Sequence, residues 1–445
     1  MLLAIRGERL EVAASERSVK RWATSNDSVE PPLSGQDIIS INAPEAGLMR
    51  MPELQDNSLK PCYTLGANHL WTGLRILHVY KDYHPTIGGI ENHIRMVAEQ
   101  QVTDGHDVTV LVTNRGGERP LDRLHGVRLI RARRLATLAS TPLSLSLLFA
   151  LARQDPDLTH LHFPFPPGEV SQWLAGRGRP YVMTYHSDVV RQTTLLRLYR
   201  PLMRRILQGA GRIVATSERQ LASSFDLNPF AAKCDVVPLA IDPRPFLEAG
   251  SRAPSATRPT VLFVGRHSHY KGVDDLIRAL SQVKAHLLIV GDGPKRSSWE
   301  SLAREVGVAE RVCFTGQAGN VALPGMYANA DLLVLPSNSR AEAFGVVLLE
   351  AMAAGLPCVT TEVGTGTSFV VQDGVTGFVV PPNNPRALAS AMNRLLSDPP
   401  LRRKMGAAGR ERVLREFTQP IMTARLADVY RRALKASLHG VAPPI

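Results

Sequence analysis

The chain has 445 residues, of which 44% are hydrophobic and 21% charged, and its formal net charge at pH 7 is +12. This length and composition exclude a disordered chain and predict two or three globular domains with apolar cores of their own. The positive excess is spread along residues 74–445, which favours an anionic partner and leaves nucleotides, nucleic acids and acidic lipids open.

Residues 1–73 show no sustained periodicity. Polar, turn-rich patches such as TSNDSVEPPLSGQD predict a poorly ordered extension, with a functional start near Met49, Met51 or a later position as the alternative. The first apolar run is too short for a secretory signal. The four cysteines are scattered, without a C-x-x-C motif or histidines at zinc-ligand spacing. That pattern predicts reduced thiols, a cytoplasmic location and no metal site.

From residue 74 onward, short apolar runs alternate with helical segments. Strands are expected at 75–80, 107–113, 127–132, 158–163, 180–185, 212–217 and 235–239. After a linker rich in Pro, Gly and Ser (241–259) the pattern restarts, with strands at 260–265, 285–291, 311–316, 331–336, 357–361 and 377–381. Such runs are typical of parallel sheets covered by helices on both faces. The sequence therefore predicts two doubly wound α/β domains in tandem, with a ligand cleft at the carboxyl ends of their strands.

Segments of the first domain are candidates for crossing a membrane or for binding to its surface. The uncharged run 135–152 favours a core helix beginning near Pro142 over a transmembrane span. The run 123–134 and the helix expected at 191–207 combine Arg with Leu, which suits an anionic membrane surface. A helix packed on the sheet with a solvated Arg face is the alternative.

Polar residues follow several of the expected strands. Gly88 and Gly89 permit a tight turn and close approach of backbone to a ligand before a helix, or simply end a loop. His186 follows the strand 180–185 and can make one directed hydrogen bond to a hydroxyl, or can be a structural residue. Arg266 and Lys271 flank a glycine-edged loop before a helix, which predicts an anion site for a diphosphate, with a solvated basic loop as the alternative.

The segment EAFGVVLLEAMAAG (342–355) places two acids in an apolar stretch. On a helix, Glu342 and Glu350 would project roughly 80° apart, which one exposed face could accommodate. However, the flanking residues are apolar on every face, which indicates burial, and a buried carboxylate requires a partner. We expect Glu342 in a loop, a helix beginning near Phe344 or Gly345, and water or a backbone amide bonded to Glu350 when no ligand is present.

In this order, the motifs GGIE, TYHSD, VGRHSHYKG, IVGDGP, VLPS, EAFGVVLLEAMAAG and DGVTGFVVPPNN resemble the retaining glycosyltransferases of family 4. The resemblance covers about residues 74–435 and implies the GT-B fold, with two Rossmann-like domains facing a cleft. It implies an acceptor-binding domain over 74–245, a nucleotide-sugar-binding domain over 246–415, and a C-terminal helix and tail over 416–445 that returns to the first domain.

The resemblance also implies roles for single residues. Arg266 and Lys271 would bind the donor diphosphate, Glu350 the ribose diol, and Glu342 the donor sugar or its developing positive charge. His186 would bind the donor sugar, and Gly88 and Gly89 would admit donor and acceptor. The remaining donor-binding residues would act through their backbone, namely Gly316, Gln317, Phe344, Gly345, Val346 and Val347. No D-x-D motif lies between strands, so no metal-held diphosphate and no cofactor besides the donor are expected.

Two longer stretches, 160–169 and 363–382, resemble bacterial mannosyl- and rhamnosyltransferases of surface polysaccharide synthesis. This implies a GDP-sugar donor in preference to a UDP-sugar, and a glycan or lipid-linked acceptor at the cytoplasmic face of the membrane. The loop RHSHYKG departs from the usual Leu-rich form at His267 and His269. The rival interpretations are another nucleotide-sugar enzyme such as an epimerase, a phosphorylase, and a nucleic-acid-binding protein. The diffuse charge and an aromatic content of 6% disfavour the last of these.

Overall fold

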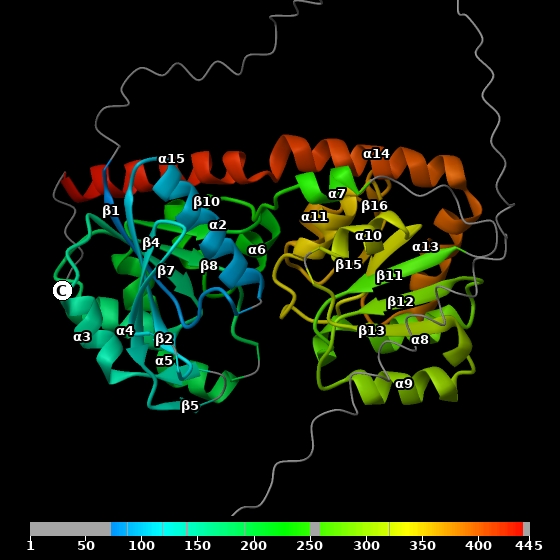
Figure 1. The fold of residues 1–445 in the computed structure, drawn as a ribbon, viewed down its shortest axis with the longest axis horizontal. Helices are drawn as coiled ribbons and strands as arrows, with labels where there is room; N and C mark the ends of the chain where they lie inside the picture. Colours follow the sequence, from blue (N-terminus) through cyan, green and yellow to red (C-terminus); the bar gives the residue numbers. More distant parts are fainter. Residues whose placement is uncertain are drawn as a thin grey trace, which may run out of the picture. The chain divides into compact units, whose positions relative to one another are not determined.

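The computed structural model describes residues 73–438 apart from positions 87, 118, 139–140, 191, 250–258 and 320. These residues belong to one compact unit, which contains two large parallel sheets (Figure 1). The extension predicted for residues 1–73 lies outside the described residues, except for Gly73. Among the described helices, none combines the length and the apolar character that crossing a membrane requires.

The first sheet has the strand order β10-β9-β8-β7-β1-β2-β4-β3. Every pairing is parallel except β3 with β4. All seven strands predicted before the linker are present, most with ends within one residue. The strands are β1 (Arg75–Val79), β2 (Asp107–Asn114), β3 (Leu121–Leu124), β4 (Val127–Arg133), β7 (Leu158–Phe163), β8 (Tyr181–Tyr185), β9 (Arg212–Ala215) and β10 (Cys234–Val236).

Helices accompany this sheet, and the start of one of them differs from the prediction. Pro142 does not start a helix. It lies in β6 (Thr141–Leu143), which pairs antiparallel with β5 (Ala136–Leu138). The helix begins at Leu145 because the hydroxyl of Ser144 accepts the N–H of Leu147 as an N-cap. The helices are α2 (Gly89–Thr103), α3 (Leu145–Ala152), α4 (Pro166–Ala175), α5 (Thr193–Gly209) and α6 (Glu218–Ser223), with the 3₁₀ turn η2 (Asn228–Lys233).

The second sheet is parallel throughout, in the order β13-β12-β11-β14-β15-β16. Its strands are β11 (Thr260–Val264), β12 (His286–Val290), β13 (Val312–Gly316), β14 (Leu332–Leu335), β15 (Cys358–Thr361) and β16 (Gly377–Val380). Its helices are α7 (Arg244–Glu248), α8 (Val273–Leu280), α9 (Arg296–Glu305), α10 (Leu323–Ala328), α11 (Val346–Ala353), α12 (Thr367–Val370), α13 (Pro385–Ser397) and α14 (Pro399–Glu416), with the 3₁₀ turns η3 (His269–Lys271) and η4 (Ala309–Arg311).

The last helix returns to the first sheet. In Figure 1, α15 (Gln419–Leu438) continues the line of α14 and lies over the first sheet, whereas α14 lies over the second. Side chains of α15 share one apolar cluster with residues of four strands and α2, namely Ile76, Val97, Leu158, Val182, Val214, Met422, Leu426, Val429, Tyr430 and Ala433. The sheet that forms first in the sequence is thus covered by the last helix.

Candidate functional site

The loops after β11 and β14 meet at Gly272. This residue has a φ of 65°, and a Cβ there would lie 2.1 Å from the carbonyl oxygen of Pro336. Only glycine therefore fits, because both the left-handed backbone and the close approach exclude a side chain. The N–H of Asn338 donates to the carbonyl of Tyr270 at 2.9 Å and fixes the same contact. The result is that η3 lies against the loop leading to Glu342.

Lys271 and Glu342 form a buried ion pair in this contact. Lys271 Nζ donates to Glu342 Oε2 at 2.6 Å, and the Ser337 hydroxyl donates to the same oxygen at 3.0 Å. The two residues are only 8% and 7% exposed. Burial acts to lower the pKa of Lys271, but the facing Glu342 carboxylate and Tyr270 outweigh it and raise the pKa above its usual value. The lysine is therefore charged and held in position.

Arg266, two residues after the end of β11, is exposed. Within the described part of the chain we find no ion pair that neutralises it. Its neighbour His267 is fully buried, with its ring 4.8 Å from that of Trp299 and 6.2 Å from that of Phe314. The unusual histidine of this loop thus packs in the core, whereas His269 is exposed.

The second acid, Glu350, lies in α11, which begins at Val346 after the left-handed N-cap Gly345, as expected. The hydroxyl of Tyr327 on α10 donates to Glu350 Oε2 at 2.6 Å. Burial raises the pKa of Glu350, and the bond from Tyr327 partly opposes that shift. The prediction that water or a backbone amide would bond to Glu350 was wrong, because a side chain from a separate helix, that of Tyr327, makes this bond.

The start of α11 brings together other predicted donor-binding residues. Phe344 is buried in the core of the second sheet, and Val346 and Val347 are half-buried. Among the described residues, no acceptor takes the N–H groups of Phe344 to Val347, as is usual for the first turn of a helix. Gly316 is the last residue of β13, an edge strand of the same sheet, and Gln317 follows it. No hydrogen bond that the structure describes joins either of them to the start of α11.

In the part of the molecule built on the first sheet, called here the first half, His186 directly follows β8 and is 2% exposed. The part built on the second sheet is called the second half. Its Nε2 lies 3.1 Å from Nδ1 of His162, and its Nδ1 has no partner among the described residues. Burial, followed by the charge of His93, holds the pKa of His186 well below its usual value. Gly88 caps α2, where a Cβ would meet the Glu91 carboxylate, whereas a Cβ on Gly89 would meet open space.

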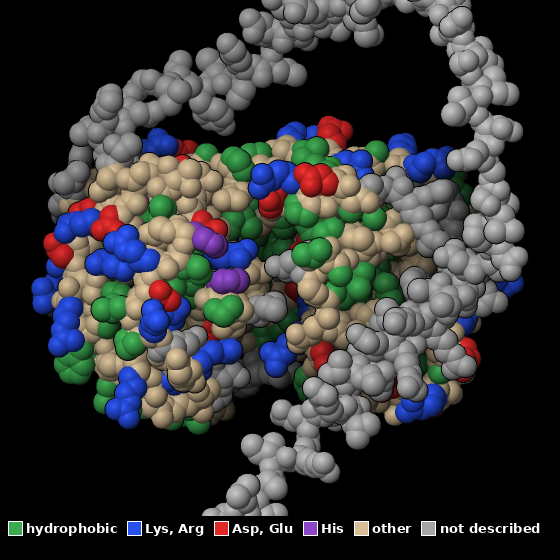
Figure 2. Space-filling model, viewed as in Figure 1, with side chains coloured by type: hydrophobic (Ala, Val, Ile, Leu, Met, Phe, Trp, Pro, Cys, Tyr) green, Lys and Arg blue, Asp and Glu red, His purple; other side chains and the backbone are tan. Residues whose placement is uncertain are grey.

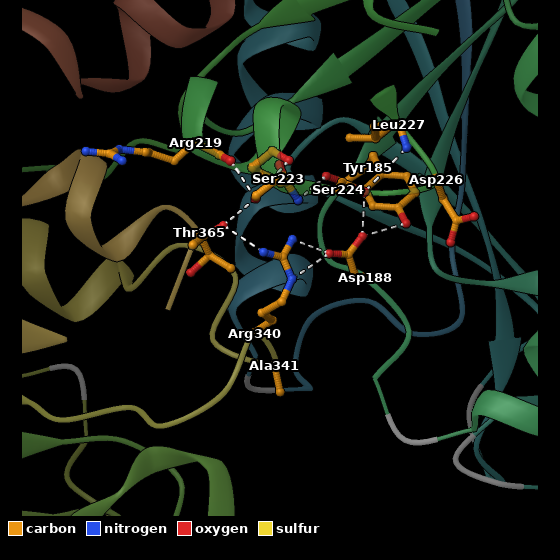
Figure 3. A network of polar contacts seen from close by, with 12 residues as sticks. Tyr185, Asp188, Arg219, Ser223, Ser224, Asp226, Leu227, Arg340, Ala341 and Thr365 are labelled. Atoms are coloured by element: carbon orange, nitrogen blue, oxygen red, sulfur yellow. Dashed lines mark hydrogen bonds and ion pairs between the residues drawn. The ribbon is translucent and has the colours of Figure 1, made fainter. Parts of the chain in front are cut away.

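An ion pair joins the two halves beside these groups (Figure 3). Arg340 Nη2 and Nε donate to Asp188 Oδ2 at 2.6 and 3.1 Å. Asp188 lies two residues after His186, and Arg340 lies two residues before Glu342. This contact, named here the Asp188–Arg340 bridge, therefore positions the loop of His186 against the loop of Glu342.

Hydroxyl groups hold the bridge in place. Asp188 Oδ1 accepts hydrogen bonds from the hydroxyls of Tyr185 at 3.0 Å and Ser224 at 2.6 Å. Arg340 Nη1 donates to the Gly364 carbonyl at 3.0 Å, and the Ser223 hydroxyl donates to that same oxygen (Figure 3). The motif TYHSD contained Asp188, but no local pattern indicated that Arg340 would be its partner.

An apolar cavity of about 870 Å³ lies next to the bridge. It is bounded by β5, β6, α4, α5 and the loop 187–190, with Ala341 from the second half. Its lining is largely aliphatic and aromatic, and Lys81 and Asp188 are its charged residues. The cavity can hold a hydrophobic chain of considerable size.

Two groups of buried histidines have the composition of a metal site. The ring nitrogens of His78, His160 and His162 come within 4.8 Å of one another, and so do those of His93, His162 and His186.

On the face shown in Figure 2, Lys and Arg side chains are scattered over both halves and form no single stripe.

Family models match both halves of the chain. The model described as "Glycosyltransferase Family 4" matches residues 87–244, and the model described as "Glycosyl transferases group 1" matches residues 249–412.

Curated relatives are similar over most of their length. The O-antigen chain mannosyltransferase C of Escherichia coli is 34% identical over 371 residues, 82% of this chain and 100% of that protein. The D-rhamnosyltransferase WbpZ of Pseudomonas aeruginosa is 36% identical over 353 residues, 78% and 92% of the two chains. A GDP-mannose-dependent alpha-(1-6)-phosphatidylinositol monomannoside mannosyltransferase of Mycobacterium tuberculosis is 30% identical over 383 residues, 80% and 98% of the two chains.

Solved structures share the fold. The sucrose-phosphate synthase of Thermosynechococcus elongatus superposes with a TM-score of 0.68 at 24% identity, covering 82% of this chain and all of that chain. HepE of Anabaena, solved with UDP-glucose, gives 0.65 at 20% identity, covering 80% and 99%. These likenesses concern the fold and confirm the predicted architecture of two Rossmann-like sheets.

Proposed function

This chain belongs to the GT-B-fold glycosyltransferases of family 4, and from that premise we propose that it moves a mannosyl or related deoxyhexosyl group from a GDP-sugar to a lipid-linked glycan with retention of configuration. The observation that carries the proposal is the buried Lys271–Glu342 pair beside the exposed Arg266. The pair is thereby fixed at the carboxyl edge of one sheet, and Arg266 adds a second cation at the same edge.

The donor diphosphate is assigned to Arg266 and Lys271. When the glycosidic bond to the nucleotide breaks, negative charge grows on the leaving phosphate. Fixed cations and helix N–H groups aimed at that charge stabilise the transition state without reorganising. The free N–H groups of Phe344, Gly345, Val346 and Val347 add to this field. These groups supply the charge stabilisation that a metal ion would otherwise provide, so the proposal includes no metal.

Glu342 and His186 are assigned to the sugar. Glycosyl transfer passes through an oxocarbenium-like transition state, which a nearby carboxylate favours. Glu342 serves this role while its second contact, to Lys271, connects it to the phosphate end. His186 is assigned to a hydroxyl of the sugar from the first half, because the Asp188–Arg340 bridge joins the loop of His186 to the loop of Glu342.

Glu350 is assigned to the ribose diol, with Tyr327 holding its carboxylate in place. Gly316 and Gln317 are assigned to the base, and Gly88 and Gly89 to the approach of donor and acceptor. The corresponding domain limits are 74–245 for the acceptor side and 246–415 for the donor side, with 416–445 returning to the former.

Two lines of support favour the GDP-sugar and the lipid-linked acceptor. Relatives at 30–36% identity are a mannosyltransferase, a rhamnosyltransferase and an enzyme whose name specifies GDP-mannose and a phosphatidylinositol mannoside. In addition, the apolar cavity beside the bridge suits the hydrocarbon part of an acceptor better than a free glycan.

A cytoplasmic membrane surface is proposed as the place of reaction. Leu195 and Leu198 of α5 are 53% and 79% exposed beside exposed Arg197, whereas Leu196 and Met203 pack in the core. Exposed leucines among arginines suit an anionic leaflet. Sedimentation with anionic liposomes at low salt tests this, and protein that stays in the supernatant would end the proposal.

Calorimetry with GDP-, UDP- and dTDP-sugars tests the assignment of the donor, and we expect a GDP-sugar to bind. NMR of the product tests the stereochemistry, and we expect the anomeric configuration of the donor to be retained. If none of these donors binds, the proposed function is wrong.

Glu342→Ala should lower kcat by at least about 100-fold while KM changes far less, because a charge-stabilising contact acts mainly in the transition state. Glu342→Gln, which keeps the shape, separates loss of charge from loss of packing. Equal effects on KM and kcat would contradict this role.

A further inference from the structure

Five histidines lie together inside the first half of the molecule. His78 is on β1, His93 on α2, His160 and His162 on β7, and His186 just after β8, and none is more than 6% exposed. A buried polar side chain is costly unless it is hydrogen-bonded. The rings of His78, His162 and His186 are hydrogen-bonded to one another in a row.

The geometry of the row is that of hydrogen bonds. His78 Nδ1 lies 3.0 Å from His162 Nε2, and His162 Nδ1 lies 3.1 Å from His186 Nε2. The ring centroids are 5.3 and 5.4 Å apart with interplanar angles of 19° and 20°, so the rings meet edge to edge and not face to face. Each contact therefore places one proton between two nitrogens, and a metal ion bound there would have to turn the rings.

The inner end of the row is fixed by an amide. Gln101 of α2 lies 2.7 Å from His78 Nε2 through its oxygen and 3.0 Å from the Tyr430 hydroxyl through its nitrogen. The opposite orientation of the amide would require a short N–H···N contact and a long O–H···O contact, whereas the observed one fits the usual lengths. Tyr430 in turn lies 2.6 Å from His160 Nδ1 and donates to it.

Each step of the row then follows from the last. The Gln101 oxygen only accepts, so His78 carries its proton on Nε2. Burial lowers the pKa of His78 to about 4, and burial followed by neighbouring histidine charge holds the pKa of His162 well below its usual value. A neutral imidazole has one proton, so Nδ1 of each ring must accept from the next.

We propose that Gln101, His78 and His162 fix the tautomer of His186, so that its proton is on Nε2 and its Nδ1 lone pair accepts a hydrogen bond from a substrate hydroxyl. Gln101, His78 and His162 are positioning residues in this arrangement. His93, whose ring is nearly perpendicular to those of His162 and His186, is not part of the row. The substrate part of the inference rests on the proposed function, whereas the tautomer does not.

The consequence for specificity is concrete. A neutral acceptor selects a hydroxyl that donates, and gives no proton to the leaving group. A donor or acceptor sugar whose hydroxyl at this point is replaced by hydrogen loses the contact and leaves Nδ1 buried without a partner.

Nitrogen-15 NMR of the full chain with labelled histidine, at about pH 7, tests the tautomer directly. His78, His162 and His186 should each carry the proton on Nε2, with the His186 signals identified by their absence in His186→Asn. A proton on Nδ1 of His186, exchange between two tautomers, or zinc binding that abolishes these signals would overturn the proposal. Because the measurement uses the protein without substrate, a failure of the proposed function leaves its result intact.

Variants test the origin of the tautomer. Gln101→Leu should mix the tautomers of His186 and lower kcat/KM about tenfold, the value of one neutral hydrogen bond. The matched control is Gln100→Leu, one residue along α2, which also breaks a contact to α15 (Gln419, 3.3 Å) but touches no histidine. It should change neither quantity. If Gln101→Leu does not fold, Tyr430→Phe takes its place, because the Gln101 amide is then free to rotate and should likewise mix the tautomers of His186. In whichever of these two variants folds, an unchanged His186 tautomer would contradict the proposal.

Discussion

At the scale of the residue, Glu350 depends on one hydroxyl. Its carboxylate is held by Tyr327 at 2.6 Å, and burial raises its pKa. Glu350→Gln should weaken nucleotide binding by about 10- to 100-fold, because a hydrogen bond to a charged acceptor becomes a neutral one. Calorimetric titration with the free nucleoside diphosphate measures this.

Tyr327→Phe provides the control for Glu350. It removes the hydroxyl and leaves the carboxylate, so it should weaken binding less than Glu350→Gln does. An affinity unchanged in both variants would remove Glu350 from the nucleotide site.

Glu169 of α4 offers a test by pH. It accepts from the N–H of Phe165 at 2.7 Å and from the Tyr199 hydroxyl, and burial raises its pKa to about 7. The folded state thus disfavours the charged form, so this residue destabilises the fold increasingly as pH rises from about 4.5 toward 7.

Glu169→Gln should therefore raise the free energy of unfolding by up to about 3 kcal/mol at pH 8 and change it little at pH 4.5. Urea unfolding at the two pH values measures the difference. A variant that is less stable at pH 8 would show that the charge has a partner that compensates for burial.

At the scale of the element, strands could be predicted from the sequence and contacts between elements could not. The short apolar runs predicted every parallel strand, because burial on both faces is a local property of composition. The hairpin β5–β6 was missed, since its strands of three residues have no such pattern. The partners of Glu350 and Asp188 were missed because Tyr327 and Arg340 are 23 and 152 residues away.

The five buried histidines, carried by β1, α2, β7 and the residue after β8, should make the first half sensitive to acid. Burial lowers the pKa of all five histidines, to about 4 for His78 and about 3 for His93. Below pH 6.5 these histidines bind protons in the unfolded chain but not in the folded chain. Their contribution to stability is therefore full above pH 6.5 and is lost as the pH falls. Each histidine contributes at most about 1.4 kcal/mol per pH unit. Glu91 and Glu169, whose pKa values are raised, act in the opposite direction but are fewer.

Urea midpoints at about pH 7.5 and about pH 5 measure this loss. His93→Phe is the informative variant, because both ring nitrogens of His93 lack a partner among the described residues. It should make the dependence on pH shallower by one proton. A midpoint that does not move between the two pH values would contradict the prediction.

At the scale of the whole molecule, the Asp188–Arg340 bridge connects the two halves of the site. Arg340→Ala should leave both halves folded, lower kcat, and increase the radius of gyration in small-angle scattering. The direct coupling of the pair is modest, about 1 kcal/mol, because the side chains are 31% and 20% exposed.

Arg219→Ala is the matched control for the bridge. Arg219 also faces a carboxylate across the two halves, that of Glu362, but at 4.0 Å and with 61% of its side chain exposed. It should have no effect on scattering or on kcat. Equal effects of the two variants would mean that the bridge has no special part in closing the site.

The return of α15 to the first sheet has a consequence for biosynthesis. The last strand of that sheet, β10, ends at Val236, and the helix that covers Ile76, Leu158, Val182 and Val214 begins at Gln419. At about 5 to 20 residues per second, the ribosome needs roughly 10 to 40 s to make the chain between them. During that time an apolar face of a nearly complete sheet is exposed on the nascent chain. The first half is thus the first to be translated and the last to be finished, and it is the natural target for a ribosome-associated chaperone.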